Sequence, residues 1–260
     1  FESVRLRAEV YLDRKLVAYD IIGESPFDAD ITEAVQPGKE QCLAVRVTNP
    51  GGNFHWQDFN EMYWGKYQIP PGRSFGGIIG RVRLDAVSPV YVSDIYMQNQ
   101  PERTKVKAIL TVNNTSAKTE KQDIYFSVYE KENPGKVILE KKLPRVALKQ
   151  GTNVVTMELH CPEARIWDLD TPYLYVCGVD VKSGKKLSDR AVQTFGFRWF
   201  EPVGIGKDAM LRLNGRRVML RTAISWGYWP ATGLYATPEM AEKQVSVAKS
   251  MGLNMLNFHP

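Results

Sequence analysis

The sequence predicts a mostly β protein: a partial β-sandwich, an immunoglobulin-like β-sandwich, and then the start of an α/β domain. Three observations predict this order. Most of the 260 residues alternate apolar and polar side chains with a period of two, which is typical of strands with one buried face. The strand-like segments are short and separated by turn sequences such as NPGG, ENPG and KSGK. A clear helical segment occurs only near the end.

Residues 1–87 are predicted to form the first unit. The segments VRLRAEVYLD, CLAVRVTN and RVRLDAV each alternate, so each is expected to be a strand with one apolar face. The unit has few such segments and a long loop at 49–77, so we expect it to lack its beginning. The apolar face of the first segment consists of Val4, Leu6, Ala8, Val10 and Leu12.

Residues 88–200 are predicted to form the second unit. About seven strand-like segments lie within roughly 110 residues, which is the size of an immunoglobulin-like sandwich. KVKAILTV, DIYFSVYE, VVTMELH and LYVCGVDV carry the clearest alternation. This unit is expected to be complete.

After residue 200 the pattern changes, and residues 201–260 are predicted to begin an α/β domain. Asn214 and Gly215 separate two alternating arms in MLRLNGRRVMLR, and Asn-Gly favours a tight hairpin because both residues tolerate positive φ. VMLRTAI, a helix and NMLNF then form a βαβ pattern.

The helix is predicted over 238–251. Thr237 is suited to cap it, Pro238 and Glu239 favour its first turn, and Gly252 favours its end. Its apolar face is predicted to contain Met240, Val245, Val247 or Ala248, and Met251.

Composition excludes several classes of protein. The net charge of +5 comes from 34 basic residues scattered among 29 acidic ones, without the basic block or stripe that nucleic-acid binding needs. No apolar run is long enough to span a membrane. Cys42, Cys161 and Cys177 lack metal-binding spacing, so we expect buried, reduced thiols, no metal and no cofactor.

Motifs for common catalytic sites are absent from the sequence. There is no P-loop, no G-x-G-x-x-G after a strand, no G-x-S-x-G and no H-E-x-x-H. The three histidines are far apart, and the acidic residues in ESPFDADIT and RIWDLDTPYLY lie where turns are predicted.

One stretch that concentrates aromatic and polar residues is NFHWQDFNEMYWGKYQ. Trp56 is placed to stack on a sugar ring and Asp58 to bind its hydroxyl groups, which predicts a carbohydrate contact. The alternative is a long loop that folds over the sandwich and buries its own rings.

The other aromatic stretch is RTAISWGYWP, at the end of the predicted first barrel strand. The C-terminal ends of strands form the active-site face of a (β/α)8 barrel. Such a barrel would bring together Trp226, Tyr228 and Trp229 with Asn257 and His259 from the next strand. The alternative is simple core packing.

The order of these parts resembles glycoside hydrolase family 2, which contains β-galactosidases, β-glucuronidases and β-mannosidases. The resemblance is carried by VYLDRKLVAYD, PFDADIT, IWDLDTPYLY, TFGFRWFE and LRLNGRRVMLR, in that order. It implies a sugar-binding jelly roll, an immunoglobulin-like domain and then a catalytic (β/α)8 barrel.

The sequence departs from the β-galactosidase motifs after both barrel strands. Where those enzymes typically carry R-G-V-N-R-H-E-H-H-P, this chain has RTAISWGYWP, which keeps Arg221 but replaces the histidines and glutamate. NMLNFHP is similar to the later N-x-V-R-x-S-H-Y-P, with Asn257 at the arginine and His259 one place short of the sugar-contacting histidine. The sugar subsite is therefore expected to be more aromatic.

The resemblance implies that the parent protein hydrolyses terminal β-glycosidic bonds by a retaining two-glutamate mechanism. Both glutamates are expected beyond residue 260, so we expect this piece alone to be inactive. Its expected partners are a carbohydrate and the rest of the barrel, with a periplasmic or secreted location; a homo-oligomer is left open. The rival hypothesis is a stand-alone carbohydrate-binding or adhesion protein.

Overall fold

The computed structural model of this chain is built mainly of β-strands, as predicted. The chain divides into two compact units. One contains Phe1–Asp85, Ile224–Val245 and Phe258–Pro260, and the other contains Ala86–Ala223 and Ser246–Asn257. The predicted domain limits of 1–87, 88–200 and 201–260 stay predictions. The structure describes residues 1–5, 7–22, 25–48, 63–64, 67–68, 77–225 and 237–258.

The first unit contains short antiparallel strands. They are β1 (Val4–Arg5), β2 (Arg7–Leu12), β3 (Lys15–Asp20), β4 (Leu43–Thr48), β5 (Tyr63–Trp64), β6 (Tyr67–Gln68) and β7 (Gly77–Ile78). β2 is the centre of the sheet β3-β2-β4, while β1 pairs with β7 and β5 with β6. Ala8, Val10 and Leu12 are buried, which confirms the predicted alternation along β2.

The strand predicted over 81–87 does not form. These residues adopt no regular structure, and the apolar positions Val82 and Leu84 are 47% and 83% exposed. Alternating apolar and polar residues do not form a strand by themselves, because the backbone N–H and C=O groups also need a neighbouring strand to bond. Here the segment follows β7 and leads into the second unit.

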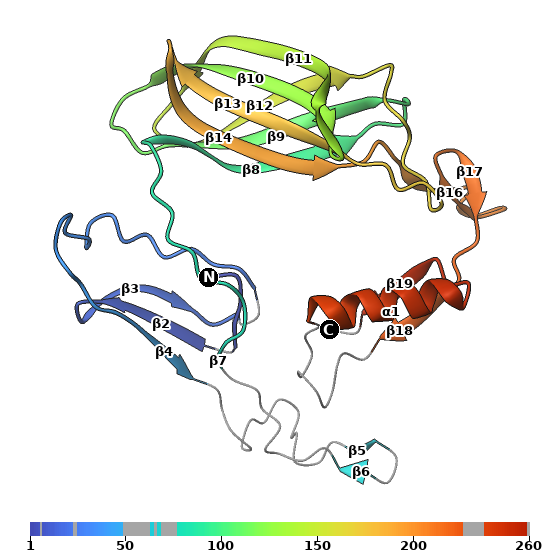
Figure 1. The fold of residues 1–260 in the computed structure, drawn as a ribbon, viewed down its shortest axis with the longest axis horizontal. Coiled ribbons are helices and arrows are strands. Elements are labelled where there is room, and N and C mark those ends of the chain that lie inside the picture. The colour runs from blue at the N-terminus through green and yellow to red at the C-terminus, as the bar shows by residue number, and fades with distance from the viewer. Residues whose placement is uncertain are drawn as a thin grey trace. The chain divides into compact units, whose positions relative to one another are not determined.

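Seven strands form the immunoglobulin-like sandwich (Figure 1). They are β8 (Val90–Asn99), β9 (Lys105–Asn114), β10 (Glu120–Glu130), β11 (Asn133–Leu148), β12 (Gly151–His160), β13 (Tyr175–Ser183) and β14 (Lys186–Phe195). One sheet has the order β11-β10-β13-β14 and the other β12-β9-β8. Neighbouring strands in both sheets are antiparallel.

The core of the sandwich lies between these two sheets. In β10, Ile124, Phe126 and Val128 are at most 1% exposed, while the residues between them face outward. β13 and β9 repeat this pattern, so each sheet contributes one apolar face. One end of the core is closed by edge-on ring contacts among Tyr175, Phe195 and Phe197. The ring centroids of Tyr175 and Phe197 are 5.3 Å apart.

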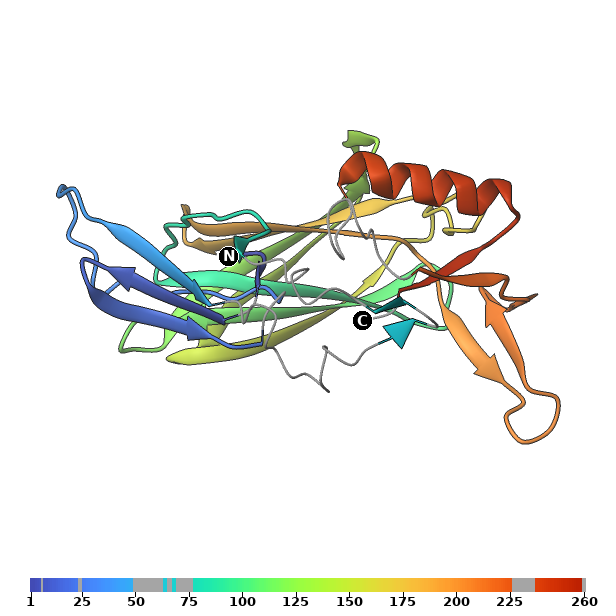
Figure 2. The same cartoon turned by 90° about the horizontal axis from the view of Figure 1, so that it is seen from below.

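Three short strands follow the sandwich: β15 (Phe200–Val203), β16 (Met210–Leu213) and β17 (Arg216–Val218). They form the antiparallel sheet β15-β16-β17, which is drawn in orange in Figure 2. Asn214 and Gly215 both have positive φ, 53° and 79°, which confirms the predicted Asn-Gly turn.

Asn214 joins this hairpin to the end of the sandwich. Its Oδ1 accepts a hydrogen bond from the Trp199 backbone N at 3.1 Å, and its Nδ2 donates to the Trp167 carbonyl at 2.8 Å. Its backbone N also donates to the Trp199 carbonyl. Asn214 is 7% exposed, so the turn residue predicted for its backbone geometry is also a buried hydrogen-bonding centre.

A second asparagine holds the neighbouring segment in the same way. Asn99 donates through Nδ2 to the Gly196 carbonyl and accepts a hydrogen bond from the Arg198 backbone N. The Arg198 guanidinium lies 4.4 Å from the Trp167 ring centroid, and a Cβ on Gly196 would lie 3.0 Å from that ring. The motifs IWDLDTPYLY, TFGFRWFE and LRLNGRR therefore meet at one junction.

The βαβ pattern consists of β18 (Thr222–Ser225), α1 (Pro238–Ser250) and β19 (Met255–Phe258), with β18 and β19 hydrogen-bonded as neighbours. Gln244 on α1 donates to the hydroxyl of the buried Ser225 on β18 at 2.6 Å. β18 begins later than the predicted strand VMLRTAI, because residues 219–221 separate it from β17. The barrel itself stays a prediction.

The ends of α1 form as predicted, but only part of its predicted apolar face is buried. Thr237 Oγ1 accepts a hydrogen bond from the Met240 backbone N, and Gly252 ends the helix with a φ of 76°. Ala248 is the buried residue of α1 in the described chain, whereas Val247 is 48% and Met251 72% exposed. Two described strands offer too little surface to cover this face.

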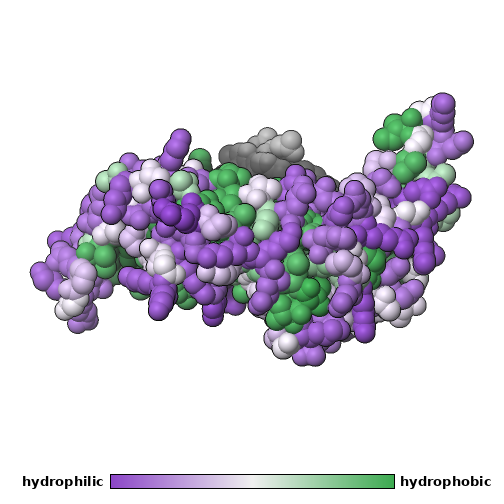
Figure 3. Space-filling view, turned by 90° about the horizontal axis from the view of Figure 1, so that it is seen from above, coloured by the Kyte–Doolittle hydropathy of each residue, from purple (hydrophilic) through white to green (hydrophobic). Residues whose placement is uncertain are grey.

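The surface is a mixture of polar and apolar side chains. Hydrophilic residues occupy most of the face drawn in Figure 3, with apolar patches between them. Opposite charges pair on it, as in Arg81 with Glu2 at 3.0 Å. In the part of the chain that the structure describes, no helix has the length and apolar character needed to cross a membrane.

The junction yields a stability prediction. We expect Asn214→Ala to destabilise the protein by about 3 kcal/mol, because it leaves partly buried backbone groups of Trp199 and Trp167 without this partner and places alanine at positive φ. Urea unfolding measures the change. Gln193→Ala, at an exposed residue of β14, is the control and should stay within ~0.5 kcal/mol. A loss below about 1 kcal/mol for Asn214→Ala would contradict the junction's role.

Candidate functional site

Arg221 and Asn257 are the two residues of the predicted sugar site that the structure describes. The remaining six predicted contacts lie outside the described residues, so their geometry is untested. They are Trp56, Asp58, Trp226, Tyr228, Trp229 and His259.

Arg221 lies immediately before β18 and binds the segment that leads into β19. Its Nε donates to the Gly252 carbonyl at 2.6 Å, and its backbone N donates to Asn254 Oδ1 at 2.9 Å. The Asn254 backbone N donates back to the Arg221 carbonyl, and Asn254 Nδ2 donates to the Met219 carbonyl. Arg221 and Asn254 therefore connect the starts of the two strands.

Asn257 lies in β19 near its C-terminal end and is exposed. In a barrel, strand ends of this kind form the substrate face, and strand starts form the opposite, stabilising face. The structure thus separates the two residues: Arg221 is at the strand start, bound to the end of α1, and Asn257 is near the strand end. Sugar contacts by either residue stay predictions.

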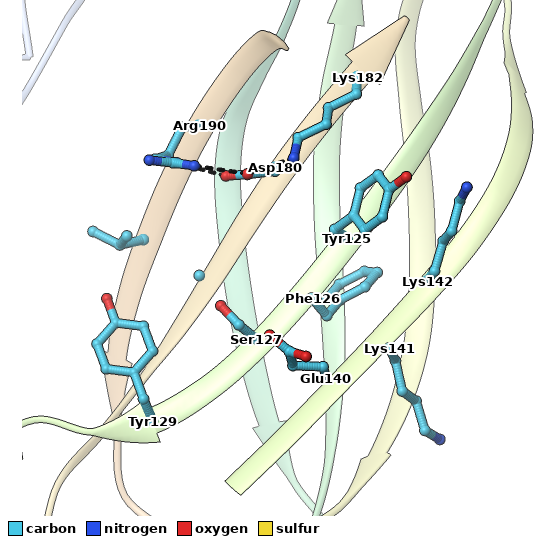
Figure 4. Close-up of a pocket in the computed structure, with 12 residues that line it drawn as sticks. Tyr125, Phe126, Ser127, Tyr129, Glu140, Lys141, Lys142, Asp180, Lys182 and Arg190 are labelled. Atoms are coloured by element: carbon cyan, nitrogen blue, oxygen red, sulfur yellow. Dashed lines mark hydrogen bonds and ion pairs between the residues drawn. The ribbon is translucent and has the colours of Figure 1, made fainter. Parts of the chain in front are cut away.

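A different polar cluster lies on the outer face of the sheet β11-β10-β13-β14 (Figure 4). It surrounds a hollow of about 530 Å³, within the ~300–1,000 Å³ typical of small-molecule sites. Tyr125, Ser127 and Tyr129 line it from β10, and Gly178 and Asp180 from β13. We call this cluster the sandwich hollow.

Cross-strand register brings these side chains together. Ser127 lies opposite Gly178, and Asp180 opposite both Tyr125 and Arg190. A Cβ on Gly178 would lie 2.7 Å from Ser127 Oγ, so the missing side chain leaves room for that hydroxyl and for the floor of the hollow. Sequence reasoning placed these residues in strands but missed the hollow, whose signal was a glycine within the alternating segment LYVCGVDV.

Ion pairs fix the polar side chains at one end of the hollow. Arg190 makes a bidentate contact with Asp180, at 2.6 Å and 2.8 Å. The Lys182 and Lys142 ammonium groups lie 4.7 Å and 4.9 Å from the Tyr125 ring centroid. Hydrogen bonding by Arg190 lowers the pKa of Asp180 below its ordinary value.

Carboxyl groups outside the hollow also have lowered pKa values. The Lys136 ammonium lowers the pKa of Glu130, and the Lys142 ammonium lowers that of Asp123. In the described ranges, every carboxyl group whose pKa departs from its ordinary value has a lowered pKa. A general acid for glycoside hydrolysis needs a raised pKa, so none of these carboxyl groups has the required property.

The cysteines correct one expectation. Cys161 and Cys177 are buried in the sandwich core, and burial raises their pKa values to about 11 and about 12. Cys42 is exposed, contrary to prediction, because it precedes β4 and is held there by hydrogen bonds with Asp13. Among the described residues, no group of three or more His, Cys, Asp or Glu side chains is arranged to hold a metal ion.

The sandwich is the part of this chain that a known protein family matches. Residues 90–198 match the family described as Glycosyl hydrolases family 2. The resemblance predicted from the sequence motifs to this family is therefore confirmed.

Relatives extend the similarity over nearly the whole chain. A β-glucuronidase of Formosa agariphila is 26% identical over 88% of this chain and 24% of its own length. A β-galactosidase of Thermoanaerobacterium thermosulfurigenes is 27% identical over 96% of this chain and 33% of its own length. The chain thus spans 24% of the length of the first relative and 33% of the length of the second.

Solved structures show the same fold. A glycosyl hydrolase family 2 member from Bacteroides cellulosilyticus matches with a TM-score of 0.76 and 21% identity, over 98% of this chain and 33% of its own. A Parabacteroides merdae β-glucuronidase matches with a TM-score of 0.73 and 22% identity, over 98% of this chain and 32% of its own.

The Asp180–Arg190 pair yields a pH prediction. Because folding lowers the pKa of Asp180, its ionised form stabilises the fold above about pH 4, and this contribution is lost as pH falls below that. We expect Asp180→Asn to be less stable than wild type at pH 7. The difference in unfolding free energy should be under ~1 kcal/mol because Arg190 is exposed, and it should become smaller in acid.

Urea unfolding at neutral and acidic pH measures this difference. Asp94→Asn, at an exposed carboxylate on β8, is the matched control and should leave stability unchanged. If the difference in unfolding free energy between Asp180→Asn and wild type became larger in acid, the stabilising role of the ionised Asp180 would be wrong.

Proposed function

We propose that this chain is the non-catalytic portion of a family 2 glycoside hydrolase that removes terminal sugars from β-glycosides, with a β-galactosidase-like activity. One observation carries the proposal: the sandwich matched at residues 90–198 is followed in the same chain by the junction and by β18, α1 and β19. Relatives named β-glucuronidase and β-galactosidase align across both parts.

The proposed reaction uses two glutamates and retains the configuration of the sugar. One protonates the leaving oxygen and the other attacks the anomeric carbon, which requires carboxyl groups about 5–5.5 Å apart. The lowered pKa values of the described carboxyl groups favour structural roles for them. We therefore place both catalytic glutamates on later barrel strands, as the family resemblance implies.

The rest of the barrel is the proposed partner of the βαβ segment. Ile224 on β18 and Phe258 on β19 are 53% and 58% exposed. Parallel strands of α/β proteins are normally buried on both faces, so these apolar side chains are suited to packing against further strands and helices. This packing would leave Asn257 near the substrate face of the completed barrel.

Hydrolysis of nitrophenyl β-glycosides tests the proposal. The panel contains the β-galactoside, β-glucuronide and β-mannoside. We expect the 260-residue chain to release no nitrophenol from any of them, because it lacks the acid and the nucleophile. The longer protein with the completed barrel should hydrolyse at least one.

Two results would contradict the proposal. Hydrolysis by the 260-residue chain would place a catalytic pair within it. Failure of the longer protein on every glycoside, while it remains folded by circular dichroism, would favour the binding-only alternative.

We also propose a periplasmic or secreted location for the parent protein, where β-linked carbohydrates are degraded. Buried free thiols such as Cys161 and Cys177 fit either compartment, so this proposal rests on the substrates that such enzymes degrade. Fractionation of cells that express the native gene measures the location. Recovery of the protein with a cytoplasmic marker would overturn it.

A further inference from the structure

We propose that the sandwich hollow binds a short neutral oligosaccharide. The hollow lies on β10, β11, β13 and β14, and all of its described lining residues belong to the unit that contains the sandwich. Asn257, the predicted sugar contact that the structure describes in β19, is not among them. The proposal therefore goes beyond the proposed function and assigns a separate site to the non-catalytic part of the chain.

Gly178 is the first observation that points to a ligand. A glycine inside a strand costs roughly 0.5–1 kcal/mol relative to alanine, and it commonly marks a bulge, a bend or a close approach by a ligand. The register is regular on both sides of Gly178, and its φ is not positive. Neither a bulge nor backbone geometry requires glycine there. The missing side chain makes room for Ser127 Oγ, which a Cβ would meet at 2.7 Å, and it also leaves the floor of the hollow open to a ligand.

The tyrosines supply the apolar part of the site. Tyr129 makes no ring contact with another described residue and stands over Gly178, its Cε1 lying 3.5 Å from the position of a Cβ on that glycine. Its face is suited to stack on the C–H surface of a sugar. Tyr125 is four residues away on β10, or about 13 Å along the strand, a distance that a short oligosaccharide spans and one ring does not.

The charges select the class of carbohydrate. The lining carries the carboxylates Glu140 and Asp180 and four cations, Lys141, Lys142, Lys182 and Arg190. Lys182 and Arg190 pair with Asp180, and Lys142 pairs with Asp123, which lies outside the lining. Lys141 Nζ donates to the Glu158 carbonyl on β12. Three of the four cations are thus held in ion pairs, and the remaining oxygens and N–H groups of these pairs are suited to bind neutral hydroxyl groups.

A protein partner fits this surface less well. Protein interfaces are centred on apolar side chains and depleted of charged groups. The exposed apolar residue of the hollow is Val192, surrounded by lysines, arginine and carboxylates. The lining thus matches a polyhydroxylated ligand with one stacking face.

Titration calorimetry of the 260-residue chain tests the proposal. The probes are short neutral β-linked gluco-, galacto-, manno- and xylo-oligosaccharides, with oligogalacturonate as the acidic comparison. We expect at least one neutral probe to bind and Tyr129→Ala to weaken it about tenfold, because the stacking surface is lost. Gly178→Val should abolish binding by filling the floor of the hollow.

Tyr96→Ala is the matched control, because Tyr96 is a 56% exposed tyrosine on β8 in the other sheet. It should bind like wild type. Circular dichroism and thermal unfolding establish whether each variant is folded. If Gly178→Val does not fold, the binding of Tyr129→Ala alone decides the test.

Three results would overturn the proposal: no neutral probe binds, only oligogalacturonate binds, or Tyr129→Ala binds as tightly as wild type. The measurement contains no hydrolysis step. Loss of binding in the hollow therefore leaves the proposed glycosidase activity untouched, and absence of glycosidase activity leaves the hollow untouched.

Discussion

Close packing between the two sheets of the sandwich is the constraint on which the remaining structure depends. Ile124, Phe126 and Val128 must face inward to fill the core, so the period of two forces Tyr125 and Tyr129 outward. A one-residue slip would exchange these faces, bury polar groups and expose the apolar ones. Core packing therefore selects one register for β10, and that register positions the sandwich hollow.

The junction fixes the backbone between the sandwich and the strands that precede the βαβ segment. Hydrogen bonds of Asn99 and Asn214 bind the backbone on both sides of Phe197, which is itself in the core. The motifs of the family resemblance meet here, which gives them an architectural role. Side-chain amides are suited to it, because one amide both donates and accepts and so satisfies two backbone groups.

Local patterns in the sequence were sufficient where the physical cause is local. The alternation along β2, the positive φ of Asn214 and Gly215, and the cap at Thr237 each depend on a few adjacent residues. The strand predicted at 81–87 failed because alternation does not supply a pairing partner, and the face of α1 failed because burial depends on what packs against it. The hollow was missed because it needs the register of four strands.

Arg221 illustrates a related difficulty in predicting sites from motifs. A motif places a residue next to a strand, but it does not say which end of the strand the side chain serves. The guanidinium contacts Gly252 at the end of α1, a place where a cation is favoured by the exposed helix carbonyls. The motif match is therefore explained by folding, whereas Asn257 has no such explanation among its described contacts.

The ion pairs and the glycine of the hollow contribute little to the stability of the sheet. Exposed ion pairs such as Asp180–Arg190 contribute only ~0–1 kcal/mol each, and glycine in a strand costs about as much. The close approach of Ser127 Oγ, which a Cβ on Gly178 would meet at 2.7 Å, accounts for the glycine. It does not account for a tyrosine over that glycine among ion pairs that contribute little stability. A ligand in the hollow would use the open space, the tyrosine face and the polar groups together.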